Sequence, residues 1–125
     1  MGAFASNDWL DGSLNYTKNN ANLMVACDAQ PASYAAAVGA NALADVVMAS
    51  GDFTLSTNGS DRRLTVAAKN SVPVDTTGTV THLALVDTGT SELINVTTTT
   101  SQAITSGGSI DIPEWTIDNK APTAS

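Results

Sequence analysis

Residues 77–113 read TGTVTHLALVDTGTSELINVTTTTSQAITSGGSIDIP, the stretch of the chain in which apolar and polar side chains alternate most clearly. Such alternation is typical of a β-strand. The pattern places Val80, His82, Ala84 and Val86 on one face and Leu83 and Leu85 on the other. Apolar residues on both faces predict a central strand that is covered from both sides.

Turn-forming residues divide this stretch into strands. Residues 87–91 read DTGTS, in which Gly89 can adopt a positive φ at little cost. We therefore expect residues 93–97 to return as the second strand of an antiparallel hairpin. Residues 106–108 (SGG) predict the next turn, after which Ile110 and Ile112 point into the core and Asp111 points outward.

The end of the stretch predicts a break in a strand. Ile110 and Ile112 have even numbers, whereas the next large apolar residues, Trp115 and Ile117, have odd numbers. All four side chains can face one core only if the inward–outward alternation shifts by one residue between Ile112 and Trp115. Pro113 cannot donate a backbone hydrogen bond, so we expect a bulge or strand break near residues 113–114.

The remaining segments follow from local signals. We expect a short helix over residues 7–19, a buried strand over 23–28 and a short helix over 34–38. The apolar run of residues 43–48 is compatible with either a helix or a strand, and we favour a strand after Asp45. Asn58-Gly59 predicts a hairpin whose second strand spans residues 62–69. That strand is expected to bury Leu64, Val66 and Ala68 and to expose Arg63, Thr65 and Lys69.

These elements predict a mainly β fold, a single-domain antiparallel β-sandwich, Ig-like or jelly-roll-like, with a short N-terminal helix. The 125 residues suffice for one domain with a modest core. We expect residues 1–22 to form an N-terminal arm with the short helix, residues 23–118 the β-sandwich, and residues 119–125 a flexible tail.

Composition argues against several functional classes. The formal net charge is −7 and basic residues are few, which disfavours nucleic acid as a partner. No window has the length and apolar content of a membrane span, and residues 1–9 lack the basic and apolar regions of a signal peptide, so we expect a soluble chain made in the cytoplasm. Cys27 is the single cysteine and is interpreted as a small buried apolar residue.

No pattern of residues predicts catalysis, a cofactor or a metal site. His82 is the single histidine, and its position among apolar residues favours a structural role. Asp8 and Asp11 are interpreted as acids that stabilise a helix start. The aspartates at the expected turns suit backbone hydrogen bonds, and none belongs to an EF-hand-type calcium loop. We therefore expect that the protein is not an enzyme.

Several segments in this order resemble small proteins encoded among the virion-structure genes of tailed bacteriophages. The segments are LMVACDAQPASYAAA (23–37), ALADVVMASGDFTLS (42–56), RRLTVAAK (62–69) and GTVTHLALVDTGTSELINVTTTTSQAITSGGSIDIPEW (78–115). The resemblance spans most of the chain, and its motifs are structural in kind. It implies a virion component without catalytic activity, and it leaves the position within the particle open.

The first hypothesis from this resemblance is a capsid decoration (cement) protein that contacts the major capsid protein or other virion subunits. Identical copies normally close under rotational symmetry, and a trimer suits quasi-threefold points of a shell. Residues 1–19 or the tail after residue 119 would reach a neighbouring subunit. Trp9, Trp115 and Tyr34 are the candidate interface anchors, because large aromatic residues are enriched at such contacts. The alternative for both tryptophans is that they fill the core.

The second hypothesis is a tail-tip or fibre-associated module that binds a glycan or protein on the host surface. Sites of that kind use exposed aromatic side chains, for which Tyr16, Tyr34 and the two tryptophans are the candidates. The small number of aromatic residues argues against this role.

Overall fold

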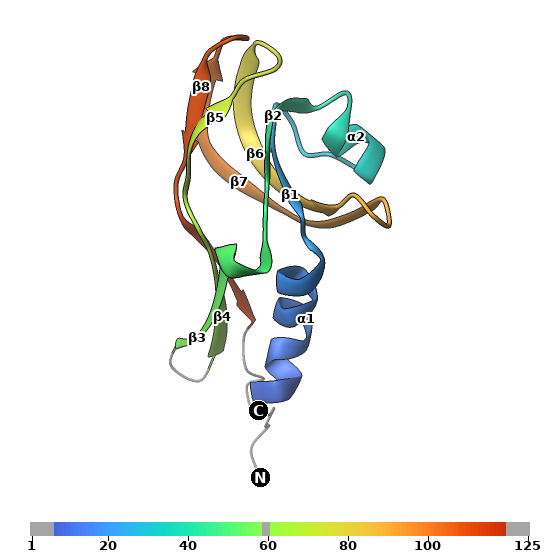
Figure 1. Cartoon of the computed structure of the whole chain (residues 1–125), viewed down its shortest axis with the longest axis vertical. Coiled ribbons are helices and arrows are strands. Elements are labelled where there is room, and N and C mark those ends of the chain that lie inside the picture. The colour runs from blue at the N-terminus through green and yellow to red at the C-terminus, as the bar shows by residue number, and fades with distance from the viewer. Residues whose placement is uncertain (1–6, 59–60, 120–125) are drawn as a thin grey trace, which may run out of the picture.

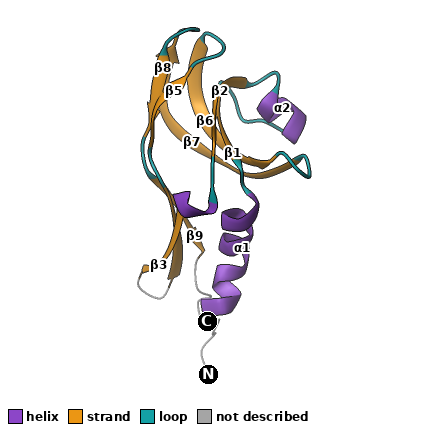
Figure 2. Cartoon of the chain, viewed as in Figure 1, coloured by secondary structure: helices purple, strands orange, loops and turns teal. Residues whose placement is uncertain are grey.

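The computed structural model describes residues 7–58 and 61–119 of the chain, and its strands and helices are shown in Figures 1 and 2. The helices are α1 (Asn7–Asn20), α2 (Tyr34–Val38) and a 3-10 turn, η1 (Ser50–Asp52). The strands are β1 (Leu23–Cys27), β2 (Ala42–Val47), β3 (Phe53–Asn58), β4 (Asp61–Val66), β5 (Lys69–Pro73), β6 (Gly78–Asp87), β7 (Glu92–Ile104), β8 (Ser109–Ile112) and β9 (Trp115–Asn119). The predicted mainly β, antiparallel fold with a short N-terminal helix is confirmed.

The strands form two layers with the main core between them. One layer is the sheet β2-β1-β6-β7, here called the first sheet. The other layer consists of the sheet β3-β4-β9 and the strand pair β5-β8. The first sheet contributes Met24, Leu83 and Leu85 to the core, and the second layer contributes Phe53, Leu64, Val72 and Ile112. In Figure 1, α2 lies on the side of β1 and β2 that faces away from β5 and β8.

The predicted break near Pro113 is confirmed. Strand β8 ends at Ile112 and β9 begins at Trp115. Ile110 and Ile112 are buried in the main core, and Trp115 and Ile117 pack against the same core. The partner strands are interrupted at the matching level, because β4 ends at Val66 and β5 begins at Lys69. The two residues between β8 and β9 therefore reset the alternation so that both strands face one core.

The predicted face of Val80 is wrong. Val80 is 1 % exposed and lies in the main core together with Leu83 and Leu85, not with Ala84 and Val86. The cause is a β-bulge in the β6–β7 ladder. Val80 pairs with Gln102 and His82 pairs with Thr98, so that Thr81 alone stands opposite three residues of β7. A bulge of this kind shifts the side chains on one side of it to the opposite face.

Two expectations for the segment around residues 62–69 are also wrong. Leu64 and Val66 are buried as predicted, but Ala68 is exposed, and the residues predicted to be exposed, Arg63, Thr65 and Lys69, are half-buried. The strand ends at Val66, and the next amide, that of Ala67, donates to the carbonyl of Asp52 at 2.8 Å. This turns the chain, so the alternation predicted through residue 69 does not continue. Likewise, β2 begins at Ala42 and therefore starts before the expected position after Asp45.

The second half of helix α1 packs on the domain. Leu14 and Thr17 of the helix are buried, as is Ala21 directly after it, and Leu14 belongs to the main core. Lys18 Nζ donates to the carbonyl oxygen of Phe53 at 2.8 Å, which ties the helix to the start of β3. The side chains of Asp8 and Asp11, predicted to stabilise the helix start, lie outside the described residues.

Asp52 joins η1 to β5, and we predict that its removal lowers stability in a pH-dependent way. Its carboxylate accepts from the Ala49 amide at 2.8 Å and from Lys69 Nζ at 2.9 Å. Burial acts to raise the pKa of Asp52, but these hydrogen bonds and the Lys69 charge outweigh it, and the net pKa is lowered. Its contribution is therefore present above the unfolded-state pKa and is lost as the pH falls through the lower folded-state value.

In urea denaturation near neutral pH, Asp52→Asn should cost about 1–2 kcal/mol of unfolding free energy. The difference from the unchanged protein should shrink as the pH falls below about 4. Asp75→Asn, at an exposed position between β5 and β6, is the control and should stay within about 0.5 kcal/mol. An equal loss in both variants would contradict the prediction.

Candidate functional site

The outer face of the first sheet, the face opposite the main core, carries a row of apolar side chains that crosses all four strands. Val47 pairs with Leu23, Leu23 with Val86, and Val86 with Leu93. Directly paired residues share a face of a sheet, so these four side chains lie on one side. We call them the apolar row. Val86 is buried, Leu23 and Leu93 are half-buried, and Val47 is 73 % exposed.

Helix α2 packs on this outer face. Ala37 of α2 is fully buried there against Val25, Cys27, Ala84 and Val86. The helix is five residues long and begins at the N-cap Ser33, whose hydroxyl accepts from the Ala36 amide at 3.2 Å. Helix α2 contacts all four strands of the first sheet, yet Val47 at one end of the apolar row remains 73 % exposed.

Trp115 and Tyr34, two of the three predicted interface anchors, lie on opposite sides of the first sheet. Trp115 is half-buried on β9 and packs against the main core, while Tyr34 begins α2 and packs on the opposite side of the first sheet. The side chain of Trp9, in the first turn of α1, lies outside the described residues. The indole Nε1 of Trp115 is buried and has no hydrogen-bond partner among the described residues. A role of any of the three as an anchor stays a prediction.

His82 lies beside Cys27 on the outer face of the first sheet. The two residues are directly paired between β1 and β6, and the Nδ1 of His82 shares a hydrogen bond of 2.8 Å with the hydroxyl of Thr81.

Within residues 7–58 and 61–119, no group of three or more His, Cys, Asp or Glu residues is placed to hold a metal ion. None of the described helices is both long and apolar enough to span a membrane.

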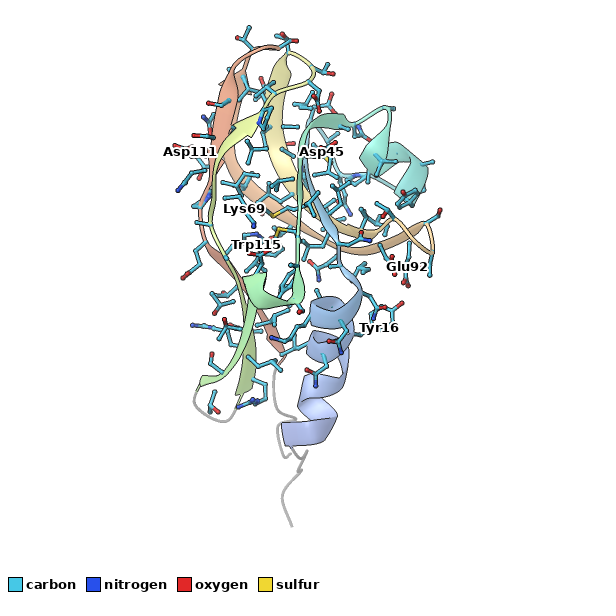
Figure 3. All side chains as sticks on the ribbon, viewed as in Figure 1. Tyr16, Asp45, Lys69, Glu92, Asp111 and Trp115 are labelled. Carbon is cyan, nitrogen blue, oxygen red and sulfur yellow. The ribbon has the colours of Figure 1, made fainter. Side chains whose placement is uncertain are left out.

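A groove lies where α1 meets β7 and β9. It has a volume of about 240 Å³ and is lined by Leu14, Tyr16, Thr17, Glu92, Ile94, Asn95 and Ile117. Helix α1 contributes the first three residues and β7 the next three, so the groove exists only because the helix folds back beside the hairpin of β6 and β7. Figure 3 shows Tyr16 and Glu92 on the same side of the molecule, near the junction of α1 with this hairpin.

The rim of this groove is polar and negatively charged. The Tyr16 hydroxyl donates to Glu92 Oε1. This hydrogen bond, supported by burial and by the charges of Glu92 and Asp87, raises the pKa of Tyr16. Asp87 and Glu92 are directly opposite each other at the end of the β6–β7 ladder. Like charges in that arrangement repel, so the rim concentrates negative potential.

Strand β7 is one of the two edge strands of the first sheet among the described residues, and its pairing with β6 is irregular. The β6–β7 register shifts between Val80 and His82 and again between Leu85 and Val86. Bulges bend an edge strand and disfavour its pairing with a further strand. A second hollow, of about 20 Å³, lies between β7 and β8 and is no larger than the space for a water molecule. We therefore do not assign a binding role to this edge.

Tyr16 is predictable from the sequence as a candidate exposed aromatic residue, but its contact with Glu92 is not. The two residues are 76 positions apart. Nothing in the local pattern around either residue indicates the other, because their contact depends on where α1 packs. The one local hint of a functional role is the position of Glu92, a charged residue directly after the predicted turn at residues 87–91.

No family model matches the chain, and neither the curated proteins nor the solved structures include a significant match.

Proposed function

We propose that this protein is a non-enzymatic structural component of a tailed-phage virion, and that it decorates the capsid by contacts with shell subunits. The resemblance of residues 23–115 to small phage virion proteins supports this role. The proposal includes assembly of identical copies into a trimer, which suits the quasi-threefold points of a shell.

The observation that carries the proposal is the apolar row. Val47 at its outer end is 73 % exposed, and Leu23 and Leu93 are half-buried. Exposed apolar surface that continues a buried cluster is typical of a protein–protein contact. A subunit that covered this row would bury further apolar area, at roughly 25 cal/mol for each Å². Contacts of this kind add stability to a small domain with a modest core.

Quantitative mass spectrometry of purified virions tests the proposal. A decoration protein should be present on the order of hundreds of copies per particle, because a shell repeats its subunits over the whole surface. A handful of copies, in multiples of about three or six, would support the alternative of a tail-tip or fibre-associated module. Absence of the protein from purified particles would overturn both roles.

A variant phage tests the surface itself. Val47→Asp should lower the copy number per particle at least about fivefold, because it places a charge in the contact, while the isolated protein keeps its fold. Thr54→Asp adds the same charge at an exposed strand position in the second layer and is the matched control. Equal incorporation of the two variants would show that the apolar row is not the contact surface.

A further inference from the structure

The groove between α1 and β7 combines an apolar floor with a polar rim. Its floor is formed by Leu14, which is buried in the main core, and by Ile94 and Ile117, which pack against that core. Its rim is formed by Tyr16, Glu92 and Asn95. The volume of about 240 Å³ is below the roughly 300–1,000 Å³ typical of sites for drug-sized ligands. The groove therefore suits one extended side chain or a molecule of that size.

The charges around the groove favour a cation. Glu92 lines it, and Asp87 is the cross-strand neighbour of Glu92. Among the described residues, neither carboxylate has an ion-pair partner and no basic side chain lines the groove. Lys18, the basic residue of α1, donates instead to the Phe53 carbonyl. A bound cation would relieve the repulsion between the two opposed acids, in a chain whose formal net charge is −7.

Two further rim groups fit the head of such a cation. Asn95 is half-buried, and its side-chain amide has no hydrogen-bond partner among the described residues, so its oxygen is available as an acceptor. Tyr16 is 45 % exposed, which leaves part of its ring open to a guanidinium or ammonium group. Its hydroxyl already donates to Glu92 Oε1, so the ring is held beside the carboxylate.

We propose that this groove binds a lysine or arginine side chain of a partner protein. The aliphatic stem of that side chain lies on the apolar floor, and its charged head contacts Glu92 and Asn95 at the rim. Long basic side chains bury their stems in this way while the head keeps polar contacts. Charge complementarity with Glu92 and Asp87 selects this occupant over a neutral one. The inference goes beyond the proposed function, because it concerns the chemistry of the groove whether or not the partner belongs to a virion.

A small probe tests this proposal on the full chain. n-Butylguanidinium chloride, titrated at constant ionic strength, should shift the backbone amide signals of residues 14–17 and 92–95 in a saturable way. We expect a dissociation constant of about 1–30 mM, the range for a ligand of this size. n-Butanol, which keeps the stem without the charge, should give shifts at least about fivefold smaller at equal concentration. Equal shifts from n-butanol would overturn the proposal.

Two glutamate variants distinguish binding of the probe in the groove from its nonspecific attraction to a negatively charged chain. Glu92→Gln should lower the initial slope of the butylguanidinium titration about tenfold, because it removes a charge-assisted hydrogen bond. Glu114→Gln removes the same charge from an exposed position between β8 and β9 and should leave the slope within about twofold. A Glu92→Gln variant that keeps the native amide spectrum and binds the probe within twofold of the unchanged chain would overturn the proposal.

A third variant decides the question if Glu92→Gln does not fold. Asn95→Phe fills the groove from β7 without changing the charge and should abolish the saturable shifts. Retained binding in this variant would overturn the proposal.

Methyl α-D-glucopyranoside serves as the neutral polyhydroxyl probe. Saturable shifts with this sugar and none with butylguanidinium would also overturn the proposal, in favour of a glycan site.

Discussion

Replacement of Phe53 by alanine should lower the free energy of unfolding by about 3–5 kcal/mol, the largest single-residue effect on stability that we expect. Phe53 is 1 % exposed and is the largest fully buried side chain of the described residues. It lies at the start of β3, opposite Val66 of β4, and belongs to the main core between the two layers. Truncation removes apolar contacts from this core and leaves a cavity that close-packed neighbours cannot fill.

Urea denaturation followed by far-UV circular dichroism measures this loss. A domain of this size has a total stability of about 5–15 kcal/mol, so Phe53→Ala should remove between about a fifth and all of it. Val47→Ala is the matched control, since Val47 is 73 % exposed. It should change stability by less than about 0.5 kcal/mol. A loss below about 1 kcal/mol for Phe53→Ala would mean that Phe53 does not lie between two packed layers.

Local sequence patterns predicted most of the fold. The helix at α1, the short helix α2 and the hairpin of β3 and β4 follow from signals within a few residues of each element. The break between β8 and β9 was predicted from the numbering of Ile112 and Trp115 and from Pro113. These predictions succeed because the cause is local: a proline removes a backbone donor, and the alternation must then restart.

The errors occur where a distant strand changes the local pattern. Val80 continues the alternation of Ala84 and Val86 in the sequence, but extra residues in β7 shift it to the main core. Lys69 follows the alternation of β4, yet the chain turns at Ala67 and Lys69 pairs with Asp52. In both cases the deciding contact is made by residues that are far apart in the chain, and no period within one strand contains that information.

The candidate site was less predictable than the fold. The prediction of Trp9, Trp115 and Tyr34 as interface anchors rests on their residue types alone. A residue type does not indicate whether a side chain faces the core, as Trp115 does. The groove depends on the packing of α1 beside β7, and the apolar row depends on the register of four strands. Neither arrangement is encoded in a contiguous motif.

Alkylation of Cys27 by iodoacetamide at pH 8 should be at least about 100-fold slower in the native protein than in concentrated urea. Cys27 is fully buried beneath α2, with its Sγ 3.9 Å from the carbonyl oxygen of Ala37. Burial, with a smaller effect from the charge of Asp28, raises the pKa of the thiol to about 11. The thiolate is the reactive form, and a rise of about two units lowers its population at pH 8 about 100-fold. Steric exclusion of the reagent slows the reaction further.

The residual native rate should report the opening of α2 over the outer face of the first sheet. Ala37 is fully buried against Cys27, and Ala37→Gly weakens both this contact and the helix by about 1 kcal/mol. If α2 opens without global unfolding, alkylation of this variant should accelerate about fivefold, the factor that corresponds to that free energy. Ala103→Gly, at an exposed position of β7, should leave the rate unchanged. Equal acceleration in both variants would mean that Cys27 reacts only after global unfolding, and a native rate equal to the rate in urea would mean that Cys27 is not covered by α2.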